Sequence, residues 1–219
     1  MKIRQFSLAL ITALNIGLNV STKADAPNFN GGYVAAAAGA NGMTTKVIFQ
    51  DPTPEAISVD YGHTNVVGSI ATGMHWNVSP GILGFNVFAD FGNNIAELSV
   101  TDPAATVSIN LKQKESYGIS LEPGFELEKS TMAYLKLSYI QSKFDIEFTV
   151  SGLGSASEEK TYTGFGYGVG LKQLINSNLF AFTEWQEADY VTKDTDTKSV
   201  TVNVKPKNTV GLLGLGWQF

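Results

Sequence analysis

Large apolar residues alternate with glycine along the chain, and this alternation constrains the fold more than any other feature. In residues 164–172, Phe165, Tyr167 and Val169 fall on one side of an extended chain, and the glycines between them fall on the other. A period of two residues indicates a β-strand whose faces meet different surroundings. The pattern recurs in residues 68–78, 82–91, 116–127, 131–141 and 213–219, is weaker in 179–190 and is weakest in 31–40. The sequence therefore predicts an all-β protein.

The strand face that carries glycine and other small residues indicates where the apolar face points. A soluble β-sandwich also alternates, but its solvent face usually carries Lys, Glu, Thr and Arg rather than repeated glycine. Glycine with a few isolated charges suits the crowded lumen of a narrow barrel, so the apolar face would point outward to lipid. A soluble β-sandwich or a lipocalin-like barrel is the alternative.

The connections between the expected strands alternate between long and short. Long connections are expected at residues 41–65, 93–110, 145–161 and 192–207, and tight turns at 79–81, 128–130 and 176–178. Outer-membrane barrels have long extracellular loops and short periplasmic turns in this order. We therefore predict an eight-stranded antiparallel up-and-down transmembrane β-barrel with strands of about 10–12 residues. Pro123 falls within a strand, where its missing donor predicts a bulge.

Residues 1–24 are predicted to be a cleaved signal peptide, and residues 25–219 to form the outer-membrane barrel domain. A positively charged start and a short apolar stretch at residues 6–18 are followed by small residues. Cleavage is expected after Ala24, with Ala26 as the alternative end. An N-terminal membrane anchor is disfavoured because the apolar stretch is shorter than the ~20 residues that a membrane helix needs.

Charge and composition exclude several functional classes. Loss of Lys2, Arg4 and Lys23 with the leader would take the net charge from −5 to −8. An acidic chain without a basic cluster is a poor nucleic-acid binder. The absence of cysteine excludes disulfides and thiolate metal sites. Asp194 and Asp196 lack the glycine and the distal glutamate of an EF-hand loop, so we expect no metal and no cofactor.

A polar network is expected to fill the lumen, because buried charges must be paired. Glu122 is expected opposite Lys136 across one hairpin, and Lys172 diagonal to Glu184 across the next. A structural plug is favoured over a narrow ion or solute channel, since eight strands enclose little more than side chains. The predicted network comprises His75, Asp90, Glu122, Glu126, Lys136, Lys172 and Glu184, with Asn86, Gln186 and Gln218 as further lumen residues.

Aromatic residues are expected to form girdles at the two membrane interfaces. Trp76 and Trp217 would lie in the periplasmic girdle, and Tyr117, Tyr139 and Trp185 nearer the outer one. The terminal residue, Phe219, lies on the same face as Trp217 and resembles the C-terminal phenylalanine signature that the barrel assembly machinery reads.

The chain resembles the opacity-like, OmpA-type family of eight-stranded outer-membrane proteins. The resemblance rests on residues 73–91, on the glycine-alternating strand and asparagine-rich turn in 162–190 with the pair Glu184-Trp185, and on the closing NTVGLLGLGWQF. These motifs are signatures of the fold rather than of catalysis. Two departures are the alanine-rich first strand, where aromatics are usual, and Phe180 and Phe182, which face the lumen.

Catalysis is not expected, and no catalytic residue is assigned. Some small barrels modify lipid A with a Ser/His pair near the outer rim, and such a pair needs a base within hydrogen-bond reach of the hydroxyl. His75 is expected near the periplasmic end, and His63 in the first long loop, where a solvated histidine is the simpler interpretation.

The resulting expectation is a porin-like surface antigen of the bacterial outer membrane without enzymatic activity. It would stabilise the envelope or contact host or environmental ligands through long extracellular loops, which is where binding is usually carried on a rigid scaffold. The expected partners are outer-membrane lipid, lipopolysaccharide and, through Phe219, the barrel assembly machinery; no nucleic-acid partner is expected.

Overall fold

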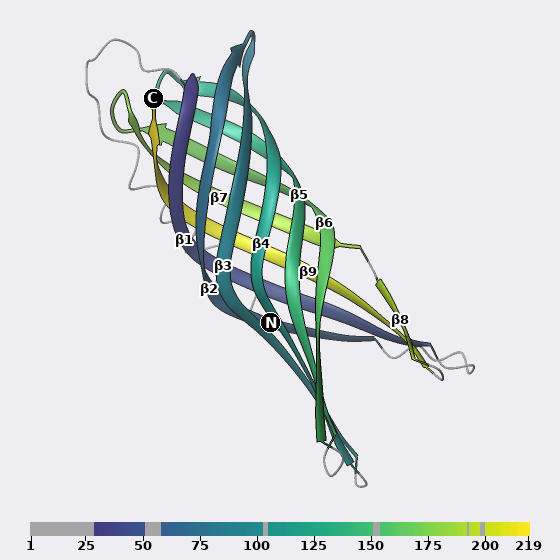
Figure 1. The fold of residues 1–219 in the computed structure, drawn as a ribbon. Helices are drawn as coiled ribbons and strands as arrows, with labels where there is room; N and C mark the ends of the chain where they lie inside the picture. The colour runs from purple at the N-terminus through teal and green to yellow at the C-terminus, as the bar shows by residue number, and fades with distance from the viewer. Residues whose placement is uncertain (1–28, 51–57, 103–104, 151–153, 192, 198–199) are drawn as a thin grey trace.

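Antiparallel strands close into a barrel in the computed structural model, which describes residues 29–50, 58–102, 105–150, 154–191, 193–197 and 200–219 (Figure 1). Each strand pairs with the next in the chain, and β1 also pairs with β9, which closes the wall. Eight strands of the described chain form this wall, and β8 is added beside β9 at one end. The strands are β1 Gly31–Gln50, β2 Ser58–Val78, β3 Gly81–Asp102, β4 Ala105–Glu128, β5 Thr131–Val150, β6 Gly154–Leu174, β7 Leu179–Tyr190, β8 Lys193–Thr197 and β9 Val200–Gln218.

The barrel is inverted relative to a soluble protein. Apolar side chains face outward and are open to the surroundings: Phe165 is 67% exposed and Leu213 52% exposed. The residues between them along the strands point inward, and many of these are polar and buried, such as Glu122 at 1% exposed and Lys172 at 3%. Within the described residues, no helix is long and apolar enough to cross a membrane.

The two ends of the barrel differ. One end carries short turns at residues 79–80, 129–130 and 175–178, and we call it the turn end. At the other, extended end the strands run on far past the closed wall, so most of the strands contain about twenty residues rather than the expected 10–12. Much of the four long connections is therefore strand, including residues 200–204.

The wall divides into two sheets at the extended end. Pairing of β2 with β3 stops at Gly68 and Phe91, and the β6–β7 ladder stops at Gly164 and Tyr190. Beyond these points β3, β4, β5 and β6 continue together as what we call the β3–β6 sheet. Strands β2, β1, β9 and β8 continue as the β2–β8 sheet. Figure 1 shows the two sheets leaving the barrel in different directions.

The prediction of a bulge at Pro123 is wrong. Pro123 is exposed and pairs in register with Leu83, and the register of β4 against β5 is the same on both sides of it. The irregularities of β4 against β5 lie elsewhere, between Gln113 and Ser116 and between Glu126 and Glu128. Since Glu122 and Pro123 form no ladder pair with β5, the missing proline donor falls in a gap of that ladder.

Inward glycines stand opposite inward aromatic side chains. Tyr134 pairs with Gly170, and Phe180 with Gly216. A Cβ atom added to Gly170 would lie 2.2 Å from Cζ of Tyr134, and one added to Gly216 would lie 2.1 Å from Cζ of Phe180. Glycine is needed at these positions because the ring of the neighbouring strand lies flat over it, a packing known to support glycines in sheets.

Candidate functional site

The centre of the lumen holds a buried ion pair between β6 and β4. Nζ of Lys172 lies 2.5 Å from Oε2 of Glu122 and 2.9 Å from Nε2 of His75. The other carboxylate oxygen of Glu122 accepts a hydrogen bond of 2.5 Å from Nδ2 of Asn86. The Lys172 ammonium also faces the ring of Tyr134, 4.6 Å from its centroid. Each charge is thus neutralised and hydrogen-bonded, as buried charges require.

A second buried ion pair lies beside the first. Nζ of Lys136 on β5 lies 2.7 Å from Oε1 of Glu184 on β7. The Tyr134 hydroxyl donates to the second oxygen of Glu184 at 2.9 Å. Lys136 also stands over the ring of Phe88, 4.4 Å from its centroid. Two lysines and two glutamates therefore form a net-neutral layer across the barrel.

The four residues differ from the expectation in how they are paired. The register is as expected, because the ladder on either side places Glu122 level with Lys136, and Lys172 lies diagonal to Glu184. The ion pairs, however, are Lys172 with Glu122 and Lys136 with Glu184. In each ion pair the two residues lie on strands that are separated by a third strand, which is β5 for the first pair and β6 for the second. In a narrow barrel, inward side chains converge across the curved wall and meet beyond their nearest neighbour.

The other predicted lumen residues have different surroundings. Asp90 accepts a hydrogen bond of 2.6 Å from Ser69, and Gln186 accepts one of 3.1 Å from Ser138. Gln218 is buried near the turn end and donates to the Ser177 carbonyl oxygen at 2.9 Å. Glu126 is a correction: it is exposed beside the turn end and forms no ion pair among the described residues. It lies where the bulge before Glu128 ends the regular alternation.

Apolar layers lie on both sides of the charged layer. Toward the turn end the lumen is filled by Phe29, Tyr33, Ile82, Met132, Tyr134, Leu174 and Phe180. Toward the extended end it is filled by Met43, Phe88, Leu111, Ile140, Phe144, Ile146, Tyr162, Ala188 and Tyr190. An ion crossing the barrel would have to pass both layers, and transfer of a charge into apolar surroundings is strongly unfavourable.

Sequence reasoning missed most of these inward aromatic residues. It expected only Phe180 and Phe182 to face the lumen, and Phe180 is fully buried there. Tyr33, Tyr134 and Phe144 are also buried inside the barrel, although no inward aromatic residue was expected at these positions. The available signal was the run of glycines on the neighbouring strand, since each glycine leaves space that a ring must fill.

A bulge in β4 at the extended end determines which polar residues face the lumen and which face outward. Two residues of β4, Lys114 and Glu115, stand opposite the single residue Lys143 of β5, so β4 has one extra residue here, and both of them point outward. Gln113 and Ser116 can then both face inward, where Gln113 donates to Ser116 at 2.7 Å. Ser116 and Tyr190 both bond to the hydroxyl of Ser142, each at 2.7 Å. Bulges commonly re-aim side chains in this way.

The outward residues of this bulge belong to a row of ion pairs on the β3–β6 sheet. Lys114 lies 2.9 Å from Asp145 and 3.2 Å from Glu159, and Lys143 lies 2.9 Å from Glu115. The hydrogen bonds to Asp145 and Glu159 hold the pKa of Lys114 above its usual value. These pairs are solvent-exposed, so we expect them to contribute little to stability.

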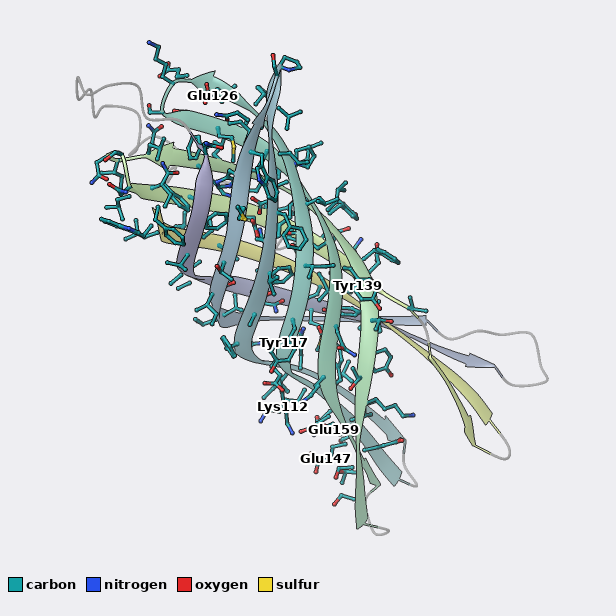
Figure 2. The ribbon with its side chains drawn as sticks, turned by 45° about the horizontal axis from the view of Figure 1, so that its top comes forward. Lys112, Tyr117, Glu126, Tyr139, Glu147 and Glu159 are labelled. Atoms are coloured by element: carbon teal, nitrogen blue, oxygen red, sulfur yellow. The ribbon has the colours of Figure 1, made fainter. Side chains whose placement is uncertain are left out.

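The predicted girdle residues lie on the outward face at the two boundaries of the apolar band. Tyr117 and Tyr139 are exposed, and the next outward positions beyond them are polar, Glu115 and Gln141. On β7 the outward residue beyond Trp185 is Glu187, which pairs with Lys207. Figure 2 shows Tyr117 and Tyr139 near the end of the closed wall, with Lys112, Glu147 and Glu159 farther along the β3–β6 sheet. Trp76, Trp217 and Phe219 are exposed near the turn end.

Both histidines lie on β2. His75 is buried in the charged layer, stacked on Tyr33 with 4.6 Å between the ring centroids. His63 lies in β2 opposite Met43, and so on a strand rather than in the expected loop. Among the described residues, no group of three or more His, Asp or Glu side chains is placed to hold a metal ion.

The family model of the outer membrane protein beta-barrel domain matches residues 6–219. The chain belongs to this family. It is accordingly a protein of the bacterial outer membrane, whose barrels expose their longer connections outside the cell and their short turns in the periplasm. The extended end is then extracellular and the turn end periplasmic. No curated protein matches the chain by sequence.

Solved structures of outer-membrane proteins are similar to this chain at low sequence identity. OprG from Pseudomonas aeruginosa is 12% identical with a TM-score of 0.50, and the match covers 89% of this chain and 99% of OprG. Neisserial surface protein A is 16% identical, with a TM-score of 0.47 and coverage of 86% and 97%. Ail, the attachment invasion locus protein of Yersinia pestis, is 14% identical, with a TM-score of 0.40 and coverage of 87% and 99%.

Proposed function

We propose that this protein is a non-conducting, non-catalytic scaffold that displays two β-sheets outside the cell and contacts molecules there through them. The observation that carries the proposal is the filled lumen beneath the two sheets. A neutral, fully paired charged layer lies between two apolar layers, so the closed part of the barrel serves to hold the extracellular part rigidly. Binding residues on a rigid scaffold are commonly carried by the segments that project from it.

The surroundings of the barrel suggest two further partners. The exposed apolar band between the aromatic girdles fits outer-membrane lipid, with lipopolysaccharide around the outer girdle of Tyr117 and Tyr139. Phe219 is 73% exposed at the periplasmic end, and its backbone N–H donates to the Gly32 carbonyl oxygen at 2.9 Å. A terminal side chain fixed in this way and open to the outside suits recognition by the barrel assembly machinery.

A conductance measurement tests the closed lumen against the alternative of a narrow channel. Reconstituted in planar bilayers, the protein is expected to give no discrete conductance steps, because both apolar layers oppose the passage of ions. Folding of the reconstituted sample is checked by its heat-modifiable mobility on gels. Discrete steps whose size changes in the variant Lys136→Glu would contradict the plugged lumen and support a channel.

Deletion on intact cells tests the extracellular role. Deleting residues 45–62 shortens β1 and β2 of the β2–β8 sheet and leaves the closed wall in place. Cells carrying this variant are expected to lose most of the binding to host or environmental surfaces that the full chain confers, while the barrel stays heat-modifiable. Protease accessibility on the same cells should place the cuts of the full chain in the two sheets. Unchanged binding, or cuts mainly in the periplasmic turns, would refute the extracellular role.

A further inference from the structure

The division of the wall leaves strand edges open outside the membrane. Beyond Phe91, the side of β3 that faced β2 has no ladder partner in the described chain as far as Asp102. An unpaired edge presents a row of backbone N–H and C=O groups, and proteins usually protect such edges with short strands, charges, lysines or prolines. The four open edges, those of β2, β3, β6 and β8, differ in how well they are protected.

The edges of β3 and β2 are the least protected of the four, because each has one charged residue and neither lysine nor proline. From Asn93 onward β3 also lacks glycine, whereas Gly62 interrupts β2 and weakens pairing there. Strand β8 has only five residues, three of them charged. The edge of β6 carries three consecutive charges, Glu158, Glu159 and Lys160. The edge of β2 contains Gly62 and Asp60 within Ser58–Val67. Between Gly92 and Thr101, β3 has Glu97 as its one charged residue and lacks lysine and proline.

The ladder of the β3–β6 sheet alternates between apolar and polar rows. Position 96 of β3 pairs with Leu111, which pairs with Ile146, and both of these are buried. The next apolar row consists of Leu98, Ile109 and Phe148. The one after it consists of Val100, Val107 and Val150. The intervening positions of β3, 97, 99 and 101, pair with asparagine, serine and threonine of β4. Up to the β3 edge, apolar and polar residues therefore occupy alternate positions of the ladder, and alternate positions of a strand belong to opposite faces of a sheet.

We propose that the edge of β3 between Gly92 and Asp102 binds an extended segment of a partner polypeptide, which adds a strand to the β3–β6 sheet. The inference rests on the proposed extracellular role and specifies its binding surface. Strand addition uses backbone hydrogen bonds for affinity and alternate side chains for specificity. The apolar and polar rows select a segment in which apolar and polar residues alternate in the same way.

The edge itself identifies the occupant as a polypeptide. A row of alternating N–H and C=O groups is matched by another extended chain, whereas a lipid offers no such row. A second copy in the same membrane fits less well. Two copies would be related by an axis along the membrane normal, so both β3 strands would run away from the membrane. This axis lies nearly parallel to the strands, so the half-turn that relates two copies paired through their β3 edges would turn the second sheet over. The apolar face of one sheet would then continue into the polar face of the other.

The test uses the full barrel in lipid nanodiscs and two synthetic peptides. The probe is a fluorescent peptide of alternating Thr and Val with a lysine at each end. The matched control peptide is N-methylated at four consecutive central residues, which removes donors from both of its edges. Fluorescence anisotropy is expected to show binding of the probe and at least about tenfold weaker binding of the control. Equal binding of both peptides would overturn strand addition.

Two variants locate the bound strand. The double variant Glu97→Lys/Ser99→Lys on β3 is expected to weaken probe binding at least about tenfold, because lysines protect edges from pairing. These two positions lie in the same rows of the ladder as Ser157 and Ser155 of β6. The matched variant Ser155→Lys/Ser157→Lys on β6 should bind within about twofold of the unsubstituted protein. Loss of binding in the β6 variant alone would assign the site to the other edge and overturn the proposal.

Hydrogen exchange supplies a measurement that needs no variant. On addition of the probe, alternate amides of residues 92–102 should exchange at least about tenfold more slowly, and those of β4 should change little. Full protection of the β3 amides without peptide, in a dimeric protein, would show that a second copy occupies the edge and overturn the proposal. If the edge binds no peptide but deletion of residues 45–62 still abolishes binding by cells, the extracellular role stands and the β3 site falls.

Discussion

Replacing Gly216 with valine is expected to destabilise the barrel by about 3 kcal/mol, near the upper end of what overpacking usually costs. Gly216 pairs with Phe180, whose ring is fully buried in the apolar layer near the periplasm. A Cβ at position 216 would lie 2.1 Å from Cζ of that ring, and the ring has little room to withdraw because it also packs edge-on against Tyr33. Urea unfolding in lipid vesicles, followed by gel mobility, measures the loss.

Gly211→Val is the matched control on the same strand. A Cβ added to Gly211 meets no atom within 4 Å, so the same substitution should change the stability by less than about 0.5 kcal/mol. Adding Phe180→Ala to the Gly216→Val variant should restore part of the lost stability, because it removes the clashing ring. Equal effects of valine at positions 211 and 216 would show that lumen packing is not the cause.

Replacing Lys172 with methionine is expected to cost about 3–5 kcal/mol, because it leaves the buried carboxylate of Glu122 without its counter-ion. Glu122 is 1% exposed and lies 2.5 Å from the Lys172 ammonium. His75 and Asn86 still reach the carboxylate, but neither supplies the full charge of lysine. The loss is measured as a lower urea midpoint of unfolding in lipid vesicles.

Two further variants separate pairing from loss of a side chain. Lys172→Met/Glu122→Gln removes both charges and should regain more than half of the stability that the single variant loses. Lys114→Met removes a lysine with two carboxylate neighbours on the exposed β3–β6 sheet, and it should leave the midpoint unchanged. If the double variant is no more stable than the single one, the buried pair does not act through charge neutralisation.

The proposed β3 site and the filled lumen depend on different parts of the chain. The two variants of the lumen change the stability of the closed wall, and the β3 variants change an edge outside it. Sites this far apart, with no shared contacts, are expected to act additively. Loss of peptide binding in a β3 variant whose wall is as stable as that of the unsubstituted protein would therefore report on the edge itself.

Local features of the chain were predictable because they depend on neighbouring residues. Alternation in residues 164–172 identified β6 and its outward face, and the turn at residues 176–178 lies where it was expected. The polar residues beyond Tyr117, Tyr139 and Trp185 could also be read from the same alternation. In a strand, each of these properties follows from a period of two residues and needs no knowledge of the rest of the fold.

The amino-acid sequence by itself determined the closed eight-stranded wall and the inside-out orientation of its faces. Only the tertiary structure decided that Lys172 pairs with Glu122 rather than Glu184, that Glu126 lies outside the network, and that the wall divides beyond Phe91. Pairing of neighbouring strands is set by local register, whereas side chains that meet across a lumen are set by the curvature of the whole barrel. The division into two sheets likewise depends on which ladders continue past the closed wall.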